Sequence, residues 1–90
     1  MQDIIRQQIA DNPVLIYIKG SAEQPLCGFS ARALNILRSC GVAFTAINVL
    51  DDPELRQAIK DYSNWPTVPQ IYIRGEFIGG SDILAEMYDN

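Results

Sequence analysis

Histidine is absent from the 90-residue sequence, and cysteine occurs only twice. Without histidine there is no Ser-His or Cys-His nucleophile pair, no imidazole metal ligand and no imidazole proton shuttle. A structural zinc site usually takes four Cys or His ligands, so a single chain is a poor candidate for one. Two cysteines are also too few for a disulfide scaffold. A reducing, intracellular compartment is therefore favoured, where a notable cysteine is more often catalytic or metal-binding.

Basic residues are few, and long apolar runs are missing. Seven lysines and arginines stand against eleven aspartates and glutamates, which gives a net charge of −4. This balance argues against a nucleic-acid partner, because such binding depends on Lys and Arg neutralising phosphates. No apolar run approaches the ~20 residues of a membrane span, and the start MQDIIR lacks the segments of a signal peptide. We expect no membrane partner and a cytoplasmic location, with a mitochondrial or plastid matrix as the alternative.

The hydrophobic pattern predicts an α/β fold in one domain, residues 1–90, with a central sheet and helices on both of its faces. The expected helices lie at residues 3–11, 27–40, 52–64 and from 81 or 82 to the end, and the expected strands at 14–18, 44–49, 71–73 and 77–78. The run VLIYI at 14–18 is apolar throughout, which indicates a strand covered on both faces. A strand–helix–strand unit followed by a hairpin makes the four-stranded sheet mixed, partly parallel and partly antiparallel.

Local signals set the ends of these elements. Asp52-Pro53 is an N-cap followed by proline at the first helical position, and Gly41 suits the residue after the second helix. Ser81 or Asp82 is expected to cap the last helix. The segment RGE at 74–76 is expected to form a tight hairpin turn. The third helix is expected to turn an apolar stripe inward, formed by Leu55, Ile59 and Tyr62.

The two cysteines differ in their expected surroundings. Cys27 lies where a helix begins, after a loop that starts at Lys19, so free backbone N–H groups, the helix dipole and the lysine charge all favour a thiolate. The alternative for Cys27 is a small buried apolar residue. Cys40 lies on the apolar stripe of the same helix and is expected in the core. Their Cα atoms would be ~20 Å apart, too far for a disulfide, and Ser30 stands where a C-x-x-C motif has its second thiol.

Three blocks of the sequence resemble the monothiol glutaredoxin signature. Lys19-Gly20, Pro25 and CGFS at 27–30 resemble K-G-x4-P-x-C-G-F-S, WPTVPQ at 65–70 resembles W-P-T-x-P-Q, and GGSD at 79–82 resembles G-G-[C/S]-D. The resemblance extends from about residue 4 to residue 88. It implies a thioredoxin-like fold, glutathione binding, a redox-active thiol in electron transport, and a role as an iron–sulfur cluster carrier in iron homeostasis.

The resemblance also implies roles for individual residues. Cys27 would be the catalytic thiol and the metal ligand, and Pro69 would be the cis-proline of the fold. Basic side chains would hold the glycine carboxylate of glutathione, the cis-proline segment its cysteinyl part, and the start of the last helix its γ-glutamyl end. The implied contacts to glutathione are Lys19, Cys27, Phe29, Arg56, Lys60, Thr67, Val68, Pro69, Gly80, Ser81 and Asp82.

Plainer interpretations stand beside these roles. Arg56 and Lys60 are four residues apart and share a helix face, which without the resemblance is a solvated face. Asp82 can be a simple helix cap. Three aromatic side chains are expected to serve packing rather than chemistry: Tyr17, Trp65 and Tyr72.

Three functions follow from the resemblance. In the first, two chains and two glutathiones supply the four thiolates of a bridging 2Fe–2S cluster, so that the protein is a homodimer with the cluster, a monomer without it, and a donor to iron–sulfur acceptor apoproteins. In the second, Cys27 is a weak glutathione-dependent oxidoreductase that reduces protein–glutathione mixed disulfides. In the third, the chain is a regulatory partner of BolA-type proteins.

The sequence departs from the family pattern in two places. Ser81 replaces a second cysteine that many members carry, which makes an intramolecular disulfide cycle less favourable and leaves cluster ligation untouched. The chain ends at Asn90, where relatives continue with a longer helix, so the resemblance implies a truncated C-terminal helix.

Overall fold

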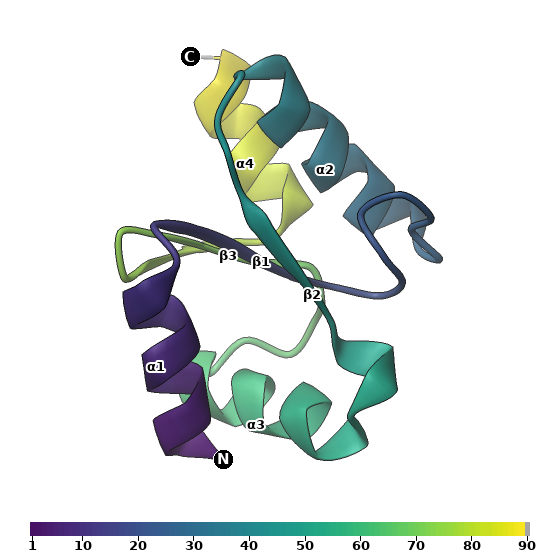
Figure 1. The fold of residues 1–90 in the computed structure, drawn as a ribbon. Helices are drawn as coiled ribbons and strands as arrows, with labels where there is room; N and C mark the ends of the chain where they lie inside the picture. Colours follow the sequence, from purple (N-terminus) through teal and green to yellow (C-terminus); the bar gives the residue numbers. More distant parts are fainter. Residues whose placement is uncertain (90) are drawn as a thin grey trace.

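The computed structural model, which describes residues 1–89, contains one mixed sheet of four strands. The strands are ordered β2-β1-β3-β4; β1 and β2 are parallel, and the other two pairs are antiparallel (Figure 1). Their bounds are β1 Val14–Ile18, β2 Thr45–Asn48, β3 Gln70–Ile73 and β4 Glu76–Gly79. The predicted mixed, four-stranded α/β sheet is therefore confirmed.

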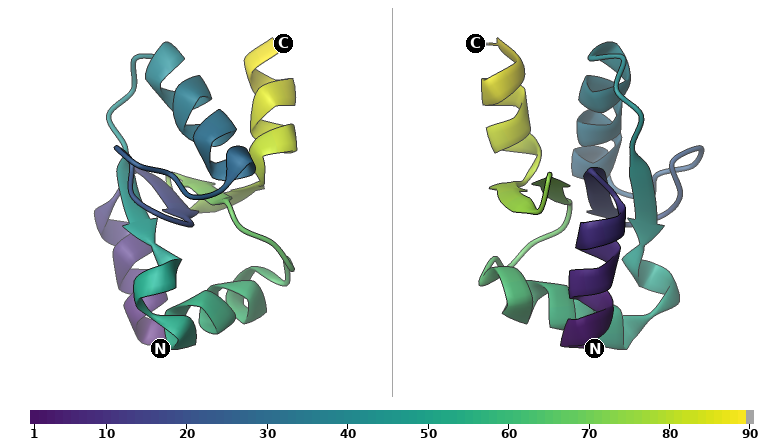
Figure 2. Two further views of the ribbon diagram at one scale, coloured as in Figure 1. Left: turned by 90° about the vertical axis from the view of Figure 1, so that its right-hand side faces the viewer. Right: turned by 60° about the vertical axis from the view of Figure 1, so that its left-hand side comes forward.

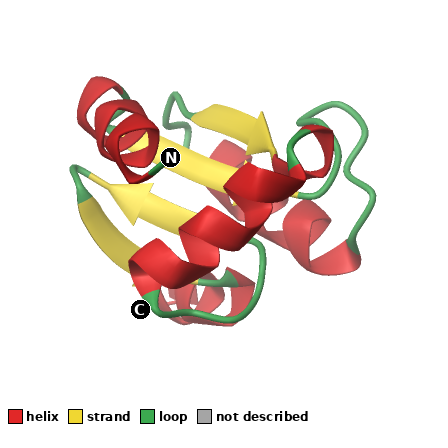
Figure 3. Cartoon of the chain, turned by 90° about the horizontal axis from the view of Figure 1, so that it is seen from below, coloured by secondary structure: helices red, strands yellow, loops and turns green. Residues whose placement is uncertain are grey.

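Helices cover both faces of this sheet. Helices α1 and α3 lie on one face, and α2 and α4 lie on the other (Figures 1 and 2). Seen from below, α3 crosses in front of the strands (Figure 3). The helices are α1 Gln2–Asp11, α2 Gly28–Ser39, α3 Pro53–Ser63 and α4 Ser81–Asp89, with a short 3-10 turn, η1, at Val49–Asp51. Within residues 1–89, no helix combines the length and the apolar character that a membrane crossing requires.

Strand β1 divides the hydrophobic core into two clusters. Leu15 and Tyr17 point into the cluster under α1 and α3, whereas Ile16 and Ile18 point into the cluster under α2 and α4. All four side chains are fully buried. This alternation follows from the period of two in a strand, and it confirms that the run VLIYI is covered on both faces.

The local signals operate as the sequence predicts, with two shifts. The Asp52 carboxylate accepts hydrogen bonds from the backbone N–H groups of Glu54 and Leu55, both at 3.1 Å, and Pro53 opens α3. The hairpin turn is shorter than expected, because Glu76 already pairs with Ile73. The two remaining turn residues, Arg74 and Gly75, have φ of 51° and 82°, the left-handed values that a type I′ turn requires. The last helix begins at Ser81. If Ser81, one of the two expected caps, were the N-cap, the first helical residue would be Asp82, so the helix begins one position earlier.

Three expected placements differ from the structure. Cys40 is exposed, because it caps the end of α2, which runs away from the sheet and leaves the last residue of the stripe without a neighbour to pack on (Figure 1). Tyr62, in the last turn of α3, is 36 % exposed, although its ring packs on Tyr72 in a tilted arrangement with 6.3 Å between the ring centroids. Strand β2 ends at Asn48, whose side chain turns the backbone by accepting from Leu50 N–H at 2.9 Å.

Candidate functional site

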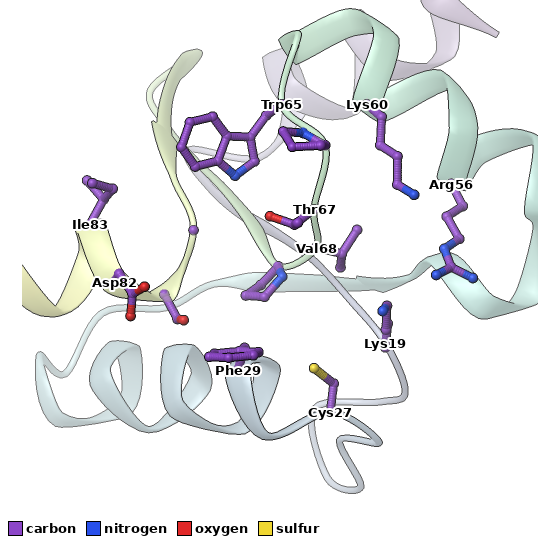
Figure 4. Close-up of a pocket in the computed structure, with 14 residues that line it drawn as sticks. Lys19, Cys27, Phe29, Arg56, Lys60, Trp65, Thr67, Val68, Asp82 and Ile83 are labelled. Atoms are coloured by element: carbon purple, nitrogen blue, oxygen red, sulfur yellow. The ribbon is translucent and has the colours of Figure 1, made fainter.

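One cavity of about 660 Å³ lies at an end of the sheet where three parts of the chain meet. They are the loop before α2 with the first turn of that helix, the segment from α3 through Pro69, and the start of α4 (Figure 4). All residues for which the sequence implied a contact line this cavity, and Trp65, Pro66 and Ile83 line it as well. The structure thus brings together side chains that are up to 64 positions apart, from Lys19 to Ile83.

Cys27 is the N-cap of α2 and is partly exposed at the cavity. The backbone N–H of Ser30 is the main reason that the pKa of the Cys27 thiol lies below its ordinary value. The Phe29 N–H, the charge of Lys19 and the Ser30 hydroxyl act in the same direction, and together these effects outweigh partial burial, which opposes them. The pattern agrees with a thiolate at a helix N-terminus, and it removes the alternative of a buried, inert cysteine.

The loop that presents Cys27 is fixed by its own backbone. Leu26 N–H donates to the Lys19 carbonyl at 2.9 Å, and Lys19 N–H donates to the Ser30 hydroxyl at 3.3 Å. Gly20 has φ of +97°, and a Cβ there would lie 2.6 Å from both the Gln24 carbonyl oxygen and the Leu26 nitrogen. Only glycine fits this close approach, which keeps Lys19 and Cys27 on the same side of the cavity.

Three cations gather at one end of the cavity, beside Cys27: Lys19, Arg56 and Lys60. Arg56 and Lys60 extend from α3 toward Lys19 (Figure 4). Neither of the two ion pairs found within residues 1–89 uses any of these three side chains. The Nε atom of Arg56 is buried and has no hydrogen-bond partner among the described residues. An unpartnered buried donor is costly, so this end of the cavity is suited to an anion.

The middle of the cavity is formed by the segment before β3. The Val68–Pro69 peptide bond is cis, as the resemblance implied. Val68 is 5 % exposed, and its side chain belongs to the core under α3. Trp65 packs on Phe77 at 5.8 Å between ring centroids and also lines the cavity. Its packing role was predicted; its place on the cavity wall was not.

The start of α4 closes the cavity at the end opposite the cations. Ser81 is buried, whereas the Asp82 side chain is largely exposed. The Asp82 carboxylate pairs with Arg32 of α2 at 2.9 Å. No sequence signal indicated this pair, because it depends on how α2 and α4 lie side by side. Asp82 thus places a carboxylate on the cavity wall, and its cationic partner Arg32 is not part of that wall.

Thiol ligands for a metal are limited to one per chain at this cavity. Among the described residues, no group of three or more His, Cys, Asp or Glu side chains could hold a metal ion. Cys40 is at the far end of α2, and both cysteines are free thiols. Phe29 and Leu26, which flank Cys27, are 60 % and 67 % exposed. One partly exposed thiol with apolar neighbours therefore meets the solvent.

Comparisons with known proteins point in one direction. The family model described as glutaredoxin matches residues 14–78. The chain is 50% identical over 88 residues to monothiol glutaredoxin-S15, mitochondrial, of Arabidopsis thaliana, across 98% of the chain and 52% of that protein. It is 49% identical over 84 residues to glutaredoxin 4 of Escherichia coli K12, across 93% of the chain and 73% of that protein. The solution structure of reduced apo GrxS14 from poplar superposes with a TM-score of 0.85 at 41% identity, over 98% of this chain and 81% of that one. The chain spans about half the length of the Arabidopsis relative.

Proposed function

The chain belongs to the monothiol branch of the glutaredoxin family, and we propose that it binds glutathione and, as a pair of copies, carries a 2Fe–2S cluster to acceptor proteins. The observation that carries the proposal is a cavity, lined by Cys27, that has a cluster of cations at one end and a carboxylate at the other. The cluster is the cargo of this function rather than a permanent part of the protein.

Charge complementarity supports glutathione as the ligand. Glutathione carries a carboxylate on its glycine, and a carboxylate and an ammonium on its γ-glutamyl group. The glycine carboxylate matches the end with Lys19, Arg56 and Lys60, where the Arg56 Nε lacks a partner. The γ-glutamyl ammonium matches Asp82, and the γ-glutamyl carboxylate matches the backbone N–H groups at the start of α4. The glutathione thiol then lies near Cys27.

The number of thiols supports a shared cluster. A 2Fe–2S cluster takes four thiolates, and each chain offers only Cys27 at the cavity. Two chains with one glutathione each complete the set. The Cys27 side chain is partly exposed and has a lowered pKa, which suits a metal ligand because the thiolate is the binding form. Half of the ligands would be exchangeable small molecules, so the cluster would be easy to release.

The proposal predicts opposite results for the two cysteines. Anaerobic reconstitution with iron, sulfide and glutathione should give a coloured dimer for the natural protein and for Cys40→Ser, and a colourless monomer for Cys27→Ser. The Cys40→Ser variant is the matched control, because it removes a thiol of the same helix that lies outside the cavity. Visible absorption and size-exclusion chromatography measure both properties. A colourless natural protein, or loss of the cluster from a folded Cys40→Ser variant, would contradict the proposal.

A second candidate function rests on the lowered pKa of Cys27. The Cys27 thiolate would attack the glutathione sulfur of a protein–glutathione mixed disulfide, release the protein thiolate and form a Cys27–glutathione disulfide. A second glutathione thiolate would attack the glutathione sulfur of that disulfide, so that oxidised glutathione leaves and the Cys27 thiolate is restored. Turnover on a glutathionylated protein well above the uncatalysed rate would favour this function. Turnover at the uncatalysed rate would exclude the oxidoreductase function and leave cluster transfer as the proposed function.

Partners and compartment follow from the same proposal. Acceptor apoproteins would receive the cluster, and a BolA-type protein would take the place of the second copy and supply some of the ligands. The compartment would be one that keeps glutathione reduced, the cytoplasm or an organelle matrix. Purification without oxygen from the native cell, followed by identification of the co-purifying proteins, tests both partners.

A further inference from the structure

The side chain of Gln70 is one of the few polar groups that the fold buries completely. It lies at the start of β3, directly after the loop from Trp65 to Pro69 that forms the middle of the cavity. Its Nε2 donates to the carbonyl oxygens of Trp65 and Thr67, each at 3.2 Å. Its Oε1 accepts from the Tyr72 hydroxyl at 3.3 Å. Every hydrogen-bonding atom of the amide therefore has a partner.

The two carbonyl groups depend on this amide. No backbone N–H within residues 1–89 donates to the carbonyl oxygen of Trp65 or Thr67. Both residues belong to the cavity wall, and Val68, which follows them, is part of the wall as well. A side chain that holds both carbonyls toward the sheet thereby determines which way the loop faces. The other contacts of the loop are two hydrogen bonds at its start, from Trp65 N–H to the Ser63 hydroxyl at 3.1 Å and to the Lys60 carbonyl at 3.2 Å, and the packing of the Trp65 and Val68 side chains.

The Tyr72 hydroxyl determines the orientation of the amide. Because the hydroxyl donates to Oε1, Nε2 is left facing the loop. A flipped amide would bring Oε1 against two carbonyl oxygens, which cannot donate to it. A buried polar network of this kind is stabilising only when each member is satisfied, so the orientation is well determined.

We propose that Gln70 is a positioning residue of the glutathione site: its amide holds the loop from Trp65 to Thr67 in the conformation that receives the ligand. The proposal rests on the proposed glutathione function. Gln70 has no place on the cavity wall itself, so it would act only through the loop.

The test uses Gln70→Met, which keeps the length of the side chain and removes the amide. Tyr17→Phe is the matched control, because it keeps the buried ring and removes another hydrogen bond, from the Tyr17 hydroxyl to Gln8 at 2.7 Å, and neither residue lines the cavity. Binding of reduced glutathione is measured by calorimetry. The environment of Trp65, the only tryptophan of the sequence, is measured by the quenching of its fluorescence with acrylamide.

We expect Gln70→Met to weaken glutathione binding by about tenfold, from the loss of two hydrogen bonds, and to make Trp65 more accessible to acrylamide. The alkylation rate of Cys27 should stay within about twofold, because α2 keeps its own hydrogen bonds. Tyr17→Phe should lower the free energy of unfolding and leave the other quantities unchanged.

The outcomes separate the two proposals. If the natural protein does not bind glutathione, the proposed function fails, and the accessibility of Trp65 alone then tests the role of Gln70. If folded Gln70→Met and the natural protein show equal quenching and equal affinity, the positioning role is wrong. If Gln70→Met does not fold, Gln70→Asn replaces it. Asparagine keeps the amide on a side chain that is one methylene shorter, and its quenching and affinity are compared with those of the natural protein in the same way.

Discussion

At the scale of single residues, the two cysteines show that a thiol is defined by what surrounds it. Both belong to the same helix, Cys27 at its beginning and Cys40 at its end. The Ser30 and Phe29 N–H groups point at the first thiol and lower its pKa. The second thiol follows the last turn, is exposed, and lies outside the cavity. The sequence predicted the first environment, because helix starts have free N–H groups wherever they occur.

The pH dependence of alkylation tests this difference. With Cys40→Ser as the parent protein, the rate of Cys27 alkylation should reach half of its maximum at a lower pH than that of an ordinary cysteine thiol. The direction follows from the folded environment, which favours the thiolate over the thiol, so in urea the midpoint should rise to the ordinary value. Lys19→Met should raise the midpoint only part of the way, because the Ser30 N–H contributes more than Lys19. A folded-state midpoint equal to that in urea would show that the helix start has no such effect.

At the scale of helices and strands, predictability follows from how local each signal is. The start of α3 is determined by two adjacent residues, Asp52 and Pro53, and the structure shows the predicted cap. The exposure of Cys40 and Tyr62 depends on where their helices end relative to the sheet. The spacing of apolar residues predicts the buried face of a helix, but not how far that helix extends past the sheet. The Arg32–Asp82 pair and the contacts of Gln70 join segments through tertiary packing, so no spacing in the sequence could have revealed them.

The cap of α3 gives a prediction at this scale. Asp52→Ala should lower the free energy of unfolding by about 1 kcal/mol, because two backbone N–H groups lose their acceptor. Asp52→Asn is the control and should retain most of that stability, since its side-chain oxygen can accept the same bonds. Urea denaturation followed by circular dichroism measures both. Equal stability of the alanine variant and the natural protein would mean that α3 does not need this cap.

At the scale of the whole molecule, the sheet separates two hydrophobic cores, yet residues from both sides of it line the same cavity. The cations Arg56 and Lys60 stand on α3, above one core, whereas Cys27 and Asp82 stand at the starts of α2 and α4, above the other. Figure 2 shows these helices on opposite sides of the strands. The family resemblance predicted that these residues would meet; the pattern of apolar residues alone predicted only the layers.

Because both cores pack on β1, we expect the chain to unfold in one transition. Leu34→Ala in one core and Ile59→Ala in the other, both fully buried, should each lower the free energy of unfolding by about 2–5 kcal/mol. Ile4→Ala is the control, because Ile4 is 52 % exposed, and should change stability by no more than about 0.5 kcal/mol. Urea curves from circular dichroism and from Trp65 fluorescence should coincide in each variant. Separate transitions for the two probes would show that the cores unfold independently.

The cavity is assembled from segments that are distant in sequence, residues 19–29, 56–69 and 80–83. A ligand that touches all three recognises the folded chain and finds no equivalent surface on the unfolded one. By mass action, such a ligand stabilises the fold by about 2.7 kcal/mol at roughly 100 times its dissociation constant. With glutathione as that ligand, the melting temperature and protease resistance of the protein would rise and fall with the glutathione concentration around it. Its lifetime in the cell would then follow the supply of the thiol that it binds.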